Sequence, residues 1–286
     1  MENDQLGMIH SATSGDVDGD GDQDLLLAGH YTPILLLKNE GGRFNADTIS
    51  DLYGWWNKVE LNDLDNDGDL DILALNHGLN SRFKSEEEGY FLYTYDYDQN
   101  RSADQVLTVK KGDSYIPIHQ KDELINQIPQ LRKNVIKYQD YARADMDDLF
   151  SKEMLDNASI MKVNHFASVV LENVDGKFIP RELPLNAQLS TMYASLIVDV
   201  NGDGRKDIIL GGNQYKAKPE IGINAASCGF LFLNKGGLNY EYVPQNVSGI
   251  YEPGEIRDIE LVNTENGPHV LFLKNSEKAS SYKIIR

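Results

Sequence analysis

The stretch Asp16-Val17-Asp18-Gly19-Asp20-Gly21-Asp22-Gln23-Asp24 decides the fold, because its pattern returns three more times between strand-like runs. We number the copies in chain order as loop 1 (16–24), loop 2 (63–71), loop 3 (96–104) and loop 4 (199–207). Every copy has Asp or Asn at positions 1, 3, 5 and 9. Side-chain oxygens at positions 1, 3 and 5 converge when the backbone wraps tightly, position 7 offers its carbonyl, and position 9 completes the shell. Hard oxygen ligands in this number predict Ca²⁺.

The predicted ligand set follows directly from these positions. Its members are Asp16, Asp18, Asp20, Asp22 and Asp24; Asp63, Asp65, Asp67, Asp69 and Asp71; Asp96, Asp98, Asn100 and Asp104; and Asp199, Asn201, Asp203, Arg205 and Asp207. Position 6 needs a positive φ, and it is Gly in all loops but loop 3, which has Arg101. We therefore expect three calcium sites and a weaker or empty fourth one in loop 3.

An EF-hand is the main alternative for such loops, because it begins in the same way. Its loop ends with a bidentate Glu at position 12 and lies between helices. Here position 12 is apolar in every copy, and each closing Asp leads into a short apolar run such as 25–28 or 72–75. Short runs bounded by Gly or Asn favour buried strands, so we expect each loop to join two strands.

Hairpin signatures follow three of the loops, at residues 34–44, 170–178 and 231–240. A unit of strand, metal loop, strand, hairpin and outer strand predicts an all-β fold, a β-propeller of four-stranded antiparallel blades. Residues 1–286 give about five units, one of them truncated. The last, at 255–273, lacks the closing Asp and is expected to hold no ion. Periodicity over 115–166, broken at Pro129, predicts a helical insertion whose second helix starts at Asp145.

The loops and the Asn-x-Gly-Gly-x-Phe hairpin make the chain similar to the FG-GAP/VCBS repeat family, the calcium-loop propellers of integrin α-subunits and large secreted bacterial proteins. The runs 74–82, 211–213 and 219–222 further resemble the C-terminal part of large Bacteroidota proteins that carry ASPIC/UnbV domains. The resemblance implies recognition or adhesion, with a glycan or a surface protein as partner. Two alternatives stay open: the five units close as a small propeller, or the chain is the C-terminal part of a longer protein with further domains.

Composition excludes several classes of function. A net charge of −18 argues against nucleic acid and anionic membrane surfaces. No apolar run approaches the length of a bilayer span, and one cysteine, Cys228, excludes an internal disulfide framework. Because loops of this kind need millimolar calcium, we expect an extracellular, cell-surface or periplasmic protein whose leader has been removed.

Two groups of residues are candidates for ligand binding. The sixth residue after each closing Asp, which is His30, His77, Lys110 or Asn213, falls at equivalent places in the repeats. These side chains either converge on a ligand near one end of a propeller or tie down neighbouring loops.

Trp55 and Trp56 form the second group. Neighbours on a strand point to opposite faces, so only one of them belongs to the core. The other is either a stacking platform for a sugar or protein partner, or a packing residue against the insertion.

We therefore expect a calcium-stabilised binding module and no enzyme. No catalytic motif is present, and nearly all the clustered Asp are committed to calcium. Two alternatives stay open: a polysaccharide-active, lyase-like enzyme on a calcium-rich propeller, and a purely architectural domain of a larger protein. Clustering of His30, His77 and Lys110 around a groove would favour the lyase.

Overall fold

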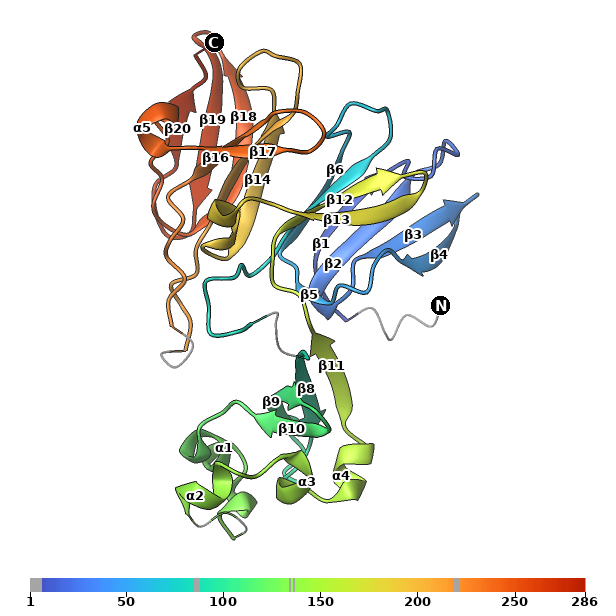
Figure 1. Ribbon diagram of the computed structural model, residues 1–286, viewed down its shortest axis with the longest axis vertical. Coiled ribbons are helices and arrows are strands. Elements are labelled where there is room, and N and C mark those ends of the chain that lie inside the picture. The colour runs from blue at the N-terminus through green and yellow to red at the C-terminus, as the bar shows by residue number, and fades with distance from the viewer. Residues whose placement is uncertain (1–6, 85–87, 134, 136, 219–221, 286) are drawn as a thin grey trace. The chain divides into compact units, whose positions relative to one another are not determined.

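The computed structural model describes residues 7–84, 88–133, 135, 137–218 and 222–285. It divides into two compact units (Figure 1). The main unit comprises Met1–Lys84 and Phe166–Arg286, and the insert unit is Ser85–His165. No helix among the described residues is long and apolar enough to cross a membrane.

Four antiparallel sheets make up the main unit, which is shown in blue, cyan, yellow and orange to red in Figure 1. Sheet 1 consists of β1 (Met8–Gly15), β2 (Asp24–Thr32), β3 (Leu35–Glu40) and β4 (Arg43–Thr48), with β5 (Gly54–Trp55) paired to β2. Sheet 2 consists of β6 (Lys58–Asn62), β7 (Asp71–Leu75), β12 (Val169–Val174) and β13 (Lys177–Glu182). Sheet 3 consists of β14 (Met192–Val198), β15 (Asp207–Gly212), β16 (Phe230–Asn234) and β17 (Tyr240–Val243). Sheet 4 consists of β18 (Ile256–Thr264), β19 (Gly267–Lys274) and β20 (Ser280–Lys283). Two short helices, η3 (Leu185–Gln188) and α5 (Gln245–Ser248), complete the unit.

The insert unit has its own sheet and its own core. The insert sheet runs β10 (Ser114–Pro117), β9 (Asp104–Lys111), β8 (Tyr90–Tyr95) and β11 (Ser159–Val163). Its helices are α1 (Lys121–Gln127), η2 (Pro129–Lys133), α2 (Tyr138–Tyr141), α3 (Met146–Leu149) and α4 (Lys152–Asp156). Leu124, Ile128 and Leu131 pack with Tyr93 and Val106 of the sheet, so these strands and helices share one hydrophobic cluster.

Burial on one or two faces explains the apolar runs of the main unit. In β7, Ile72 and Ala74 pack toward sheet 1, whereas Leu73 and Leu75 pack toward sheet 3. In β15, Ile208 likewise packs toward sheet 2 and Ile209 toward sheet 4. Because successive side chains on a strand point to opposite faces, a strand between two sheets must be apolar throughout. Every residue of β7 and β15 is buried for this reason.

Sheets 1 and 4 are packed on one face only within the described residues. In β2, Leu26 and Ala28 are buried against sheet 2, while Leu25 and Leu27 stay half-buried. Their cross-strand partners in β3, Leu37 and Leu35, are half-buried as well. The continuous apolar run at 25–28 predicts burial on both faces, and the structure shows it on one.

The first strands of the four sheets lie side by side in chain order: β1 beside β6, β6 beside β14, and β14 beside β18. Polar contacts support this arrangement, since the N–H of Val59 in β6 donates to Ser11 Oγ in β1 at 3.1 Å. From the same strand, Lys58 Nζ donates to the carbonyl of Ser195 in β14 at 3.4 Å. Among the described residues no strand pairing joins sheet 4 to sheet 1.

The insertion differs from its expected bounds. It was expected as a helical segment at 115–166, but the compact unit begins at Ser85 and includes loop 3. The reason is that β8, which leads into loop 3, pairs with β11 beyond the helices. Sheet 2 therefore obtains its last two strands, β12 and β13, from after the insertion, which explains the unit that looked truncated. The helix start at Asp145 is confirmed, since its carboxylate accepts the N–H groups of Asp147 and Asp148.

A bulge recurs where the first two strands of sheets 1 and 3 meet. Register shifts fall between Ile9 and Ser11 in β1 and between Met192 and Ala194 in β14. Opposite each shift is a glycine, Gly29 or Gly212. A Cβ on either would lie 1.9 Å from a backbone carbonyl oxygen, so only glycine permits this close approach.

Replacing Gly29 or Gly212 by Ala is therefore expected to lower the free energy of unfolding by about 1–3 kcal/mol, because the backbone must shift to admit the methyl group. Urea denaturation followed by far-UV circular dichroism measures this. Ser281→Ala, on the exposed β20, is the control and should stay within about 0.5 kcal/mol of the wild type. If all three variants were equally stable, the backbone at the two bulges could admit a methyl group without cost, which would contradict the prediction.

Candidate metal centres

The closing aspartate of each loop is the first residue of a strand and is buried. Asp24, Asp71 and Asp207 are 0% exposed and Asp104 is 6% exposed. One carboxylate oxygen accepts the backbone N–H of position 2 in its own loop. The donors are Val17 at 2.9 Å, Leu64 at 3.0 Å, Tyr97 at 3.1 Å and Val200 at 3.0 Å. This hydrogen bond fixes the two ends of the loop to each other.

In three loops the second oxygen of this carboxylate reaches the next hairpin. It accepts the backbone N–H of Asn39 for loop 1, Asn173 for loop 2 and Asn234 for loop 4, each at 2.9 Å. The side-chain oxygen of each Asn accepts a glycine N–H of its own turn. Sequence reasoning read these residues only as turn formers and missed this role. Their recurrence at the end of each third strand was the available signal.

Carboxylates at positions 1, 3 and 9 converge in three loops. In each, one oxygen from every residue lies within 4.8 Å of the other two. The three groups are Asp16, Asp18 and Asp24; Asp63, Asp65 and Asp71; and Asp96, Asp98 and Asp104. Position 5 adds a further carboxylate in loops 1 and 2: one oxygen of Asp20 and of Asp67 accepts the N–H of Asp22 and of Asp69, and the other oxygen stays available.

Loop 2 shows most directly that a cation suits this geometry. Oδ1 of Asp63 and Oδ1 of Asp69 are buried and have no hydrogen-bond donor. Burial, followed by repulsion from Asp67, raises the pKa of Asp65 and of Asp69. Burial also raises the pKa of Asp71 to about 6. Carboxylates that repel one another, two of them with a buried oxygen that has no donor, are stabilised by a hard divalent ion, so these residues fit Ca²⁺.

Residues 16–74 match the family model of the FG-GAP-like repeat. The match covers loops 1 and 2 and the strands between them, which supports the repeat family read from the loop pattern. None of the curated proteins matches the chain. The integrin-like and Bacteroidota context stays a prediction, and residues 219–221, part of the narrower resemblance, lie outside the described residues.

Loop 3 keeps the geometry of the repeat despite Arg101. That residue adopts a positive φ of 71°, where loops 1, 2 and 4 have Gly21, Gly68 and Gly204. Its N–H donates to Asp96 Oδ2 at 2.8 Å, as Gly21 does to Asp16 at 3.0 Å. The cost of Arg101 is therefore left-handed strain and a nearby positive charge, while the carboxylates still converge. That this loop binds the ion most weakly stays a prediction.

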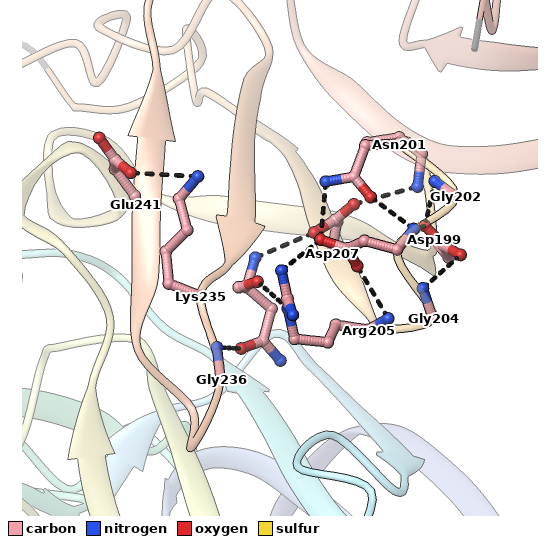
Figure 2. A network of polar contacts seen from close by, with 12 residues as sticks. Asp199, Asn201, Gly202, Gly204, Arg205, Asp207, Lys235, Gly236 and Glu241 are labelled. Atoms are coloured by element: carbon pink, nitrogen blue, oxygen red, sulfur yellow. Dashed lines mark hydrogen bonds and ion pairs between the residues drawn. The ribbon is translucent and has the colours of Figure 1, made fainter.

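Loop 4 differs from the others in its side chains. Position 3 is Asn201, whose Oδ1 accepts the N–H of Asp203 at 3.0 Å. Figure 2 shows Asp199, Asn201, Arg205 and Asp207 gathered on this loop, with Gly236 of the next hairpin nearby. The backbone N–H of Arg205 is the main cause that lowers the pKa of Asp203.

Three of the four residues expected to form a ring, His30, His77 and Asn213, belong to the main unit. His30 and His77 both contact Trp55, with ring centroids 6.4 and 5.1 Å from it, and burial lowers the pKa of each histidine to about 4. Asn213 is fully buried and donates to the carbonyls of Ser227 and Gly254. These hydrogen bonds fit the alternative in which the residue at this place of the repeat fixes neighbouring loops.

The fourth member of that set lies in the other unit. Lys110 belongs to the insert unit, where it forms an ion pair with Glu88 at 3.2 Å. Within the main unit, the two histidines pack against aromatic rings. The lyase-like enzyme stays an alternative prediction.

The two tryptophans are both packing residues in this structure. Trp56 is 0% exposed in the core between sheets 1 and 2, so it presents no face to a ligand. Trp55 is half-buried and packs edge-on against Phe83 and Phe166, at 4.7 and 5.1 Å between centroids. These two phenylalanines are at or next to the residues where the chain leaves and re-enters the main unit. Trp55 therefore packs with two residues of the main unit that flank the insertion in the chain.

Asp71→Ala is expected to destabilise the protein even in chelator, because the N–H groups of Leu64 and Asn173 both lose their buried acceptor. The expected decrease in the free energy of unfolding is about 2–4 kcal/mol. Asp67→Ala is the matched change within loop 2, and we expect its destabilisation only when calcium is present. Chemical denaturation of both variants with calcium and with chelator measures this; equal losses in chelator would contradict the role of the closing aspartate.

Trp55→Ala should loosen the junctions of the insert unit by removing the ring between Phe83 and Phe166. Limited proteolysis with mass spectrometry should detect faster cleavage on both sides of the insert unit. Tyr251→Ala is the control, because that side chain is 61% exposed. An unchanged cleavage pattern would contradict this role of Trp55 and would favour the alternative that it binds a ligand.

Proposed function

We propose that the chain is a calcium-stabilised binding module of an extracellular, surface or periplasmic protein. The observation that carries the proposal is the convergence of three sets of carboxylates, at equivalent positions of loops 1, 2 and 3. Asp16, Asp63 and Asp96 would each hold an ion together with positions 3 and 9 of the same loop. When bound, the ion supplies charge neutralisation and cross-links the start and end of each loop.

Calcium in this proposal is structural rather than regulatory. The closing aspartates are already fixed by backbone donors, so a loop between two core strands has little freedom to switch. Binding energy then adds to folding energy. FG-GAP repeats occur in extracellular adhesion-like modules, which supports the same compartment and class for this chain.

The arrangement proposed for the main unit is an arc of propeller blades around an axis lined by β1, β6, β14 and β18. Two observations support it: these first strands are neighbours in chain order, and each sheet packs face to face on the next. On this view the insert unit is an additional blade-like sheet with a helical cover, placed between β7 and β12.

The activity we propose is recognition of a glycan or a surface protein, without catalysis. The candidate histidines are packed in an aromatic cluster, and the clustered aspartates belong to the loops. Exposed aromatic rings that suit a partner lie elsewhere. Tyr251 is 61% exposed in the main unit, and Tyr138 is 63% exposed in the insert unit.

Calcium should raise the melting temperature of the wild type, and at a free concentration 100 times the dissociation constant each site should add about 2.7 kcal/mol. Differential scanning calorimetry with calcium, with magnesium and with chelator measures the effect. Magnesium is the control, because it demands a stricter octahedral shell. Identical melting curves in calcium and chelator would contradict the proposal.

Recognition is tested on a glycan array probed with calcium and with chelator, while the retained glycans are examined for cleavage. Retention of intact glycan in calcium supports a lectin-like module, and Tyr251→Ala and Tyr138→Ala then locate the site. New unsaturated chain ends would contradict the non-catalytic reading. No retention in either condition would remove glycans as partners.

A further inference from the structure

Loop 4 has an electrostatic composition unlike that of loops 1 and 2. Each of those loops contains five aspartates and no basic residue, whereas loop 4 contains three aspartates, Arg205 and Lys206. At position 7 the contrast is direct: Asp22 and Asp69 occupy it in loops 1 and 2, and Arg205 occupies it in loop 4. A site with less negative charge attracts a divalent cation less strongly.

The Arg205 side chain is fixed inside the loop by two polar groups. Its guanidinium group forms an ion pair with Asp203 at position 5, and its Nε donates to the backbone carbonyl of Asn234 at 2.7 Å. Its own N–H donates to Asp203 Oδ1 at 3.0 Å. Figure 2 shows Arg205 lying between the loop and the hairpin of Gly236. An arginine held at both ends in this way acts as a fixed cation within the loop.

Asn234 links this arginine to the rest of the sheet. It is 1% exposed, and its N–H donates to Asp207, the closing aspartate of the same loop. Its side-chain nitrogen donates to the carbonyl of Leu64 in loop 2 at 2.8 Å. Arg205, Asp207 and Leu64 therefore meet at one buried residue, which joins sheet 3 to sheet 2.

We propose that Arg205 is a built-in counter-cation that holds loop 4 closed without calcium, so that this loop binds calcium more weakly than loops 1 and 2. This rests on the proposed calcium binding by the other loops. An ion entering loop 4 must compete with the guanidinium group for Asp203, and it meets Asn201 in place of a third-position carboxylate. The contact between sheets 2 and 3 then stays intact when calcium is scarce.

The carboxylate at position 1 of loop 4 is already hydrogen-bonded by the loop backbone, as Asp16 of loop 1 is by Gly19 and Gly21. Asp199 accepts the N–H groups of Gly202 and Gly204, at 2.6 and 3.0 Å. In loop 2, by contrast, Oδ1 of Asp63 and Oδ1 of Asp69 are buried with no donor. Loop 2 therefore depends on a cation from solution, while loop 4 carries a positive charge of its own.

The test compares the wild type with Arg205→Gln by hydrogen–deuterium exchange in chelator and by calcium titration. In chelator, we expect peptides covering loop 4 of the wild type to exchange more slowly than those covering loop 2. Arg205→Gln should abolish that difference. It should also tighten calcium binding at loop 4 by about tenfold, because a partly exposed unit charge beside the site is removed. Arg181→Gln breaks an ordinary surface ion pair with Glu172 and is the matched control.

Unchanged exchange and unchanged affinity in Arg205→Gln would overturn the proposal. Arg205→Lys keeps the positive charge but loses the several N–H donors of the guanidinium group, so its loop 4 peptides should exchange at an intermediate rate. It serves as the second variant if Arg205→Gln does not fold. A failure of the proposed function gives a separate result, because the wild type would then bind no calcium in loops 1 and 2. The exchange comparison in chelator does not depend on calcium, so it would still decide the role of Arg205.

Discussion

The structure of the main unit depends on a buried carboxylate at the start of the second strand in each of sheets 1, 2 and 3. Asp24, Asp71 and Asp207 each accept one N–H from their own loop and one from the asparagine at the end of the neighbouring strand. Burying a carboxylate is costly unless it is hydrogen-bonded, so this pairing is obligatory. A carboxylate has about four acceptor directions, and the remaining ones are available to an ion. The same side chain thus closes the loop, anchors the hairpin and contributes to the metal centre.

Packing on both faces of a sheet is the second constraint. Sheets 2 and 3 each lie between two others, and β7 and β15 can therefore hold no polar side chain after their first aspartate. This requirement places a charged loop directly beside a fully apolar strand. The result is a repeating unit in which the clustered carboxylates are confined to one end of the strand and the core begins at the next residue.

Much of the fold could be read from local pattern. Positions 1, 3 and 9 of the loops, the strands that follow them and the N-cap at Asp145 all depend on residues close in sequence. The bounds of the insertion could not be read in this way, because they depend on β8 pairing with β11 across more than sixty residues. The role of position 5 as a ligand stays a prediction, since one oxygen of Asp20 and of Asp67 accepts a local N–H and the other is available. The contacts of the Arg205 side chain could not be predicted from local pattern either, because its Nε donates to the carbonyl of Asn234 in another hairpin.

The central claim is that the converging carboxylates bind calcium, and anomalous diffraction from crystals grown with calcium or terbium tests it most directly. We predict peaks at loops 1 and 2 about 2.3–2.6 Å from oxygens of positions 1, 3 and 9, as expected for calcium. The closing aspartates should keep their backbone donors. A map without peaks at these two loops, in crystals where Asp24 and Asp71 retain those hydrogen bonds, would contradict the account and leave the loops as purely hydrogen-bonded turns.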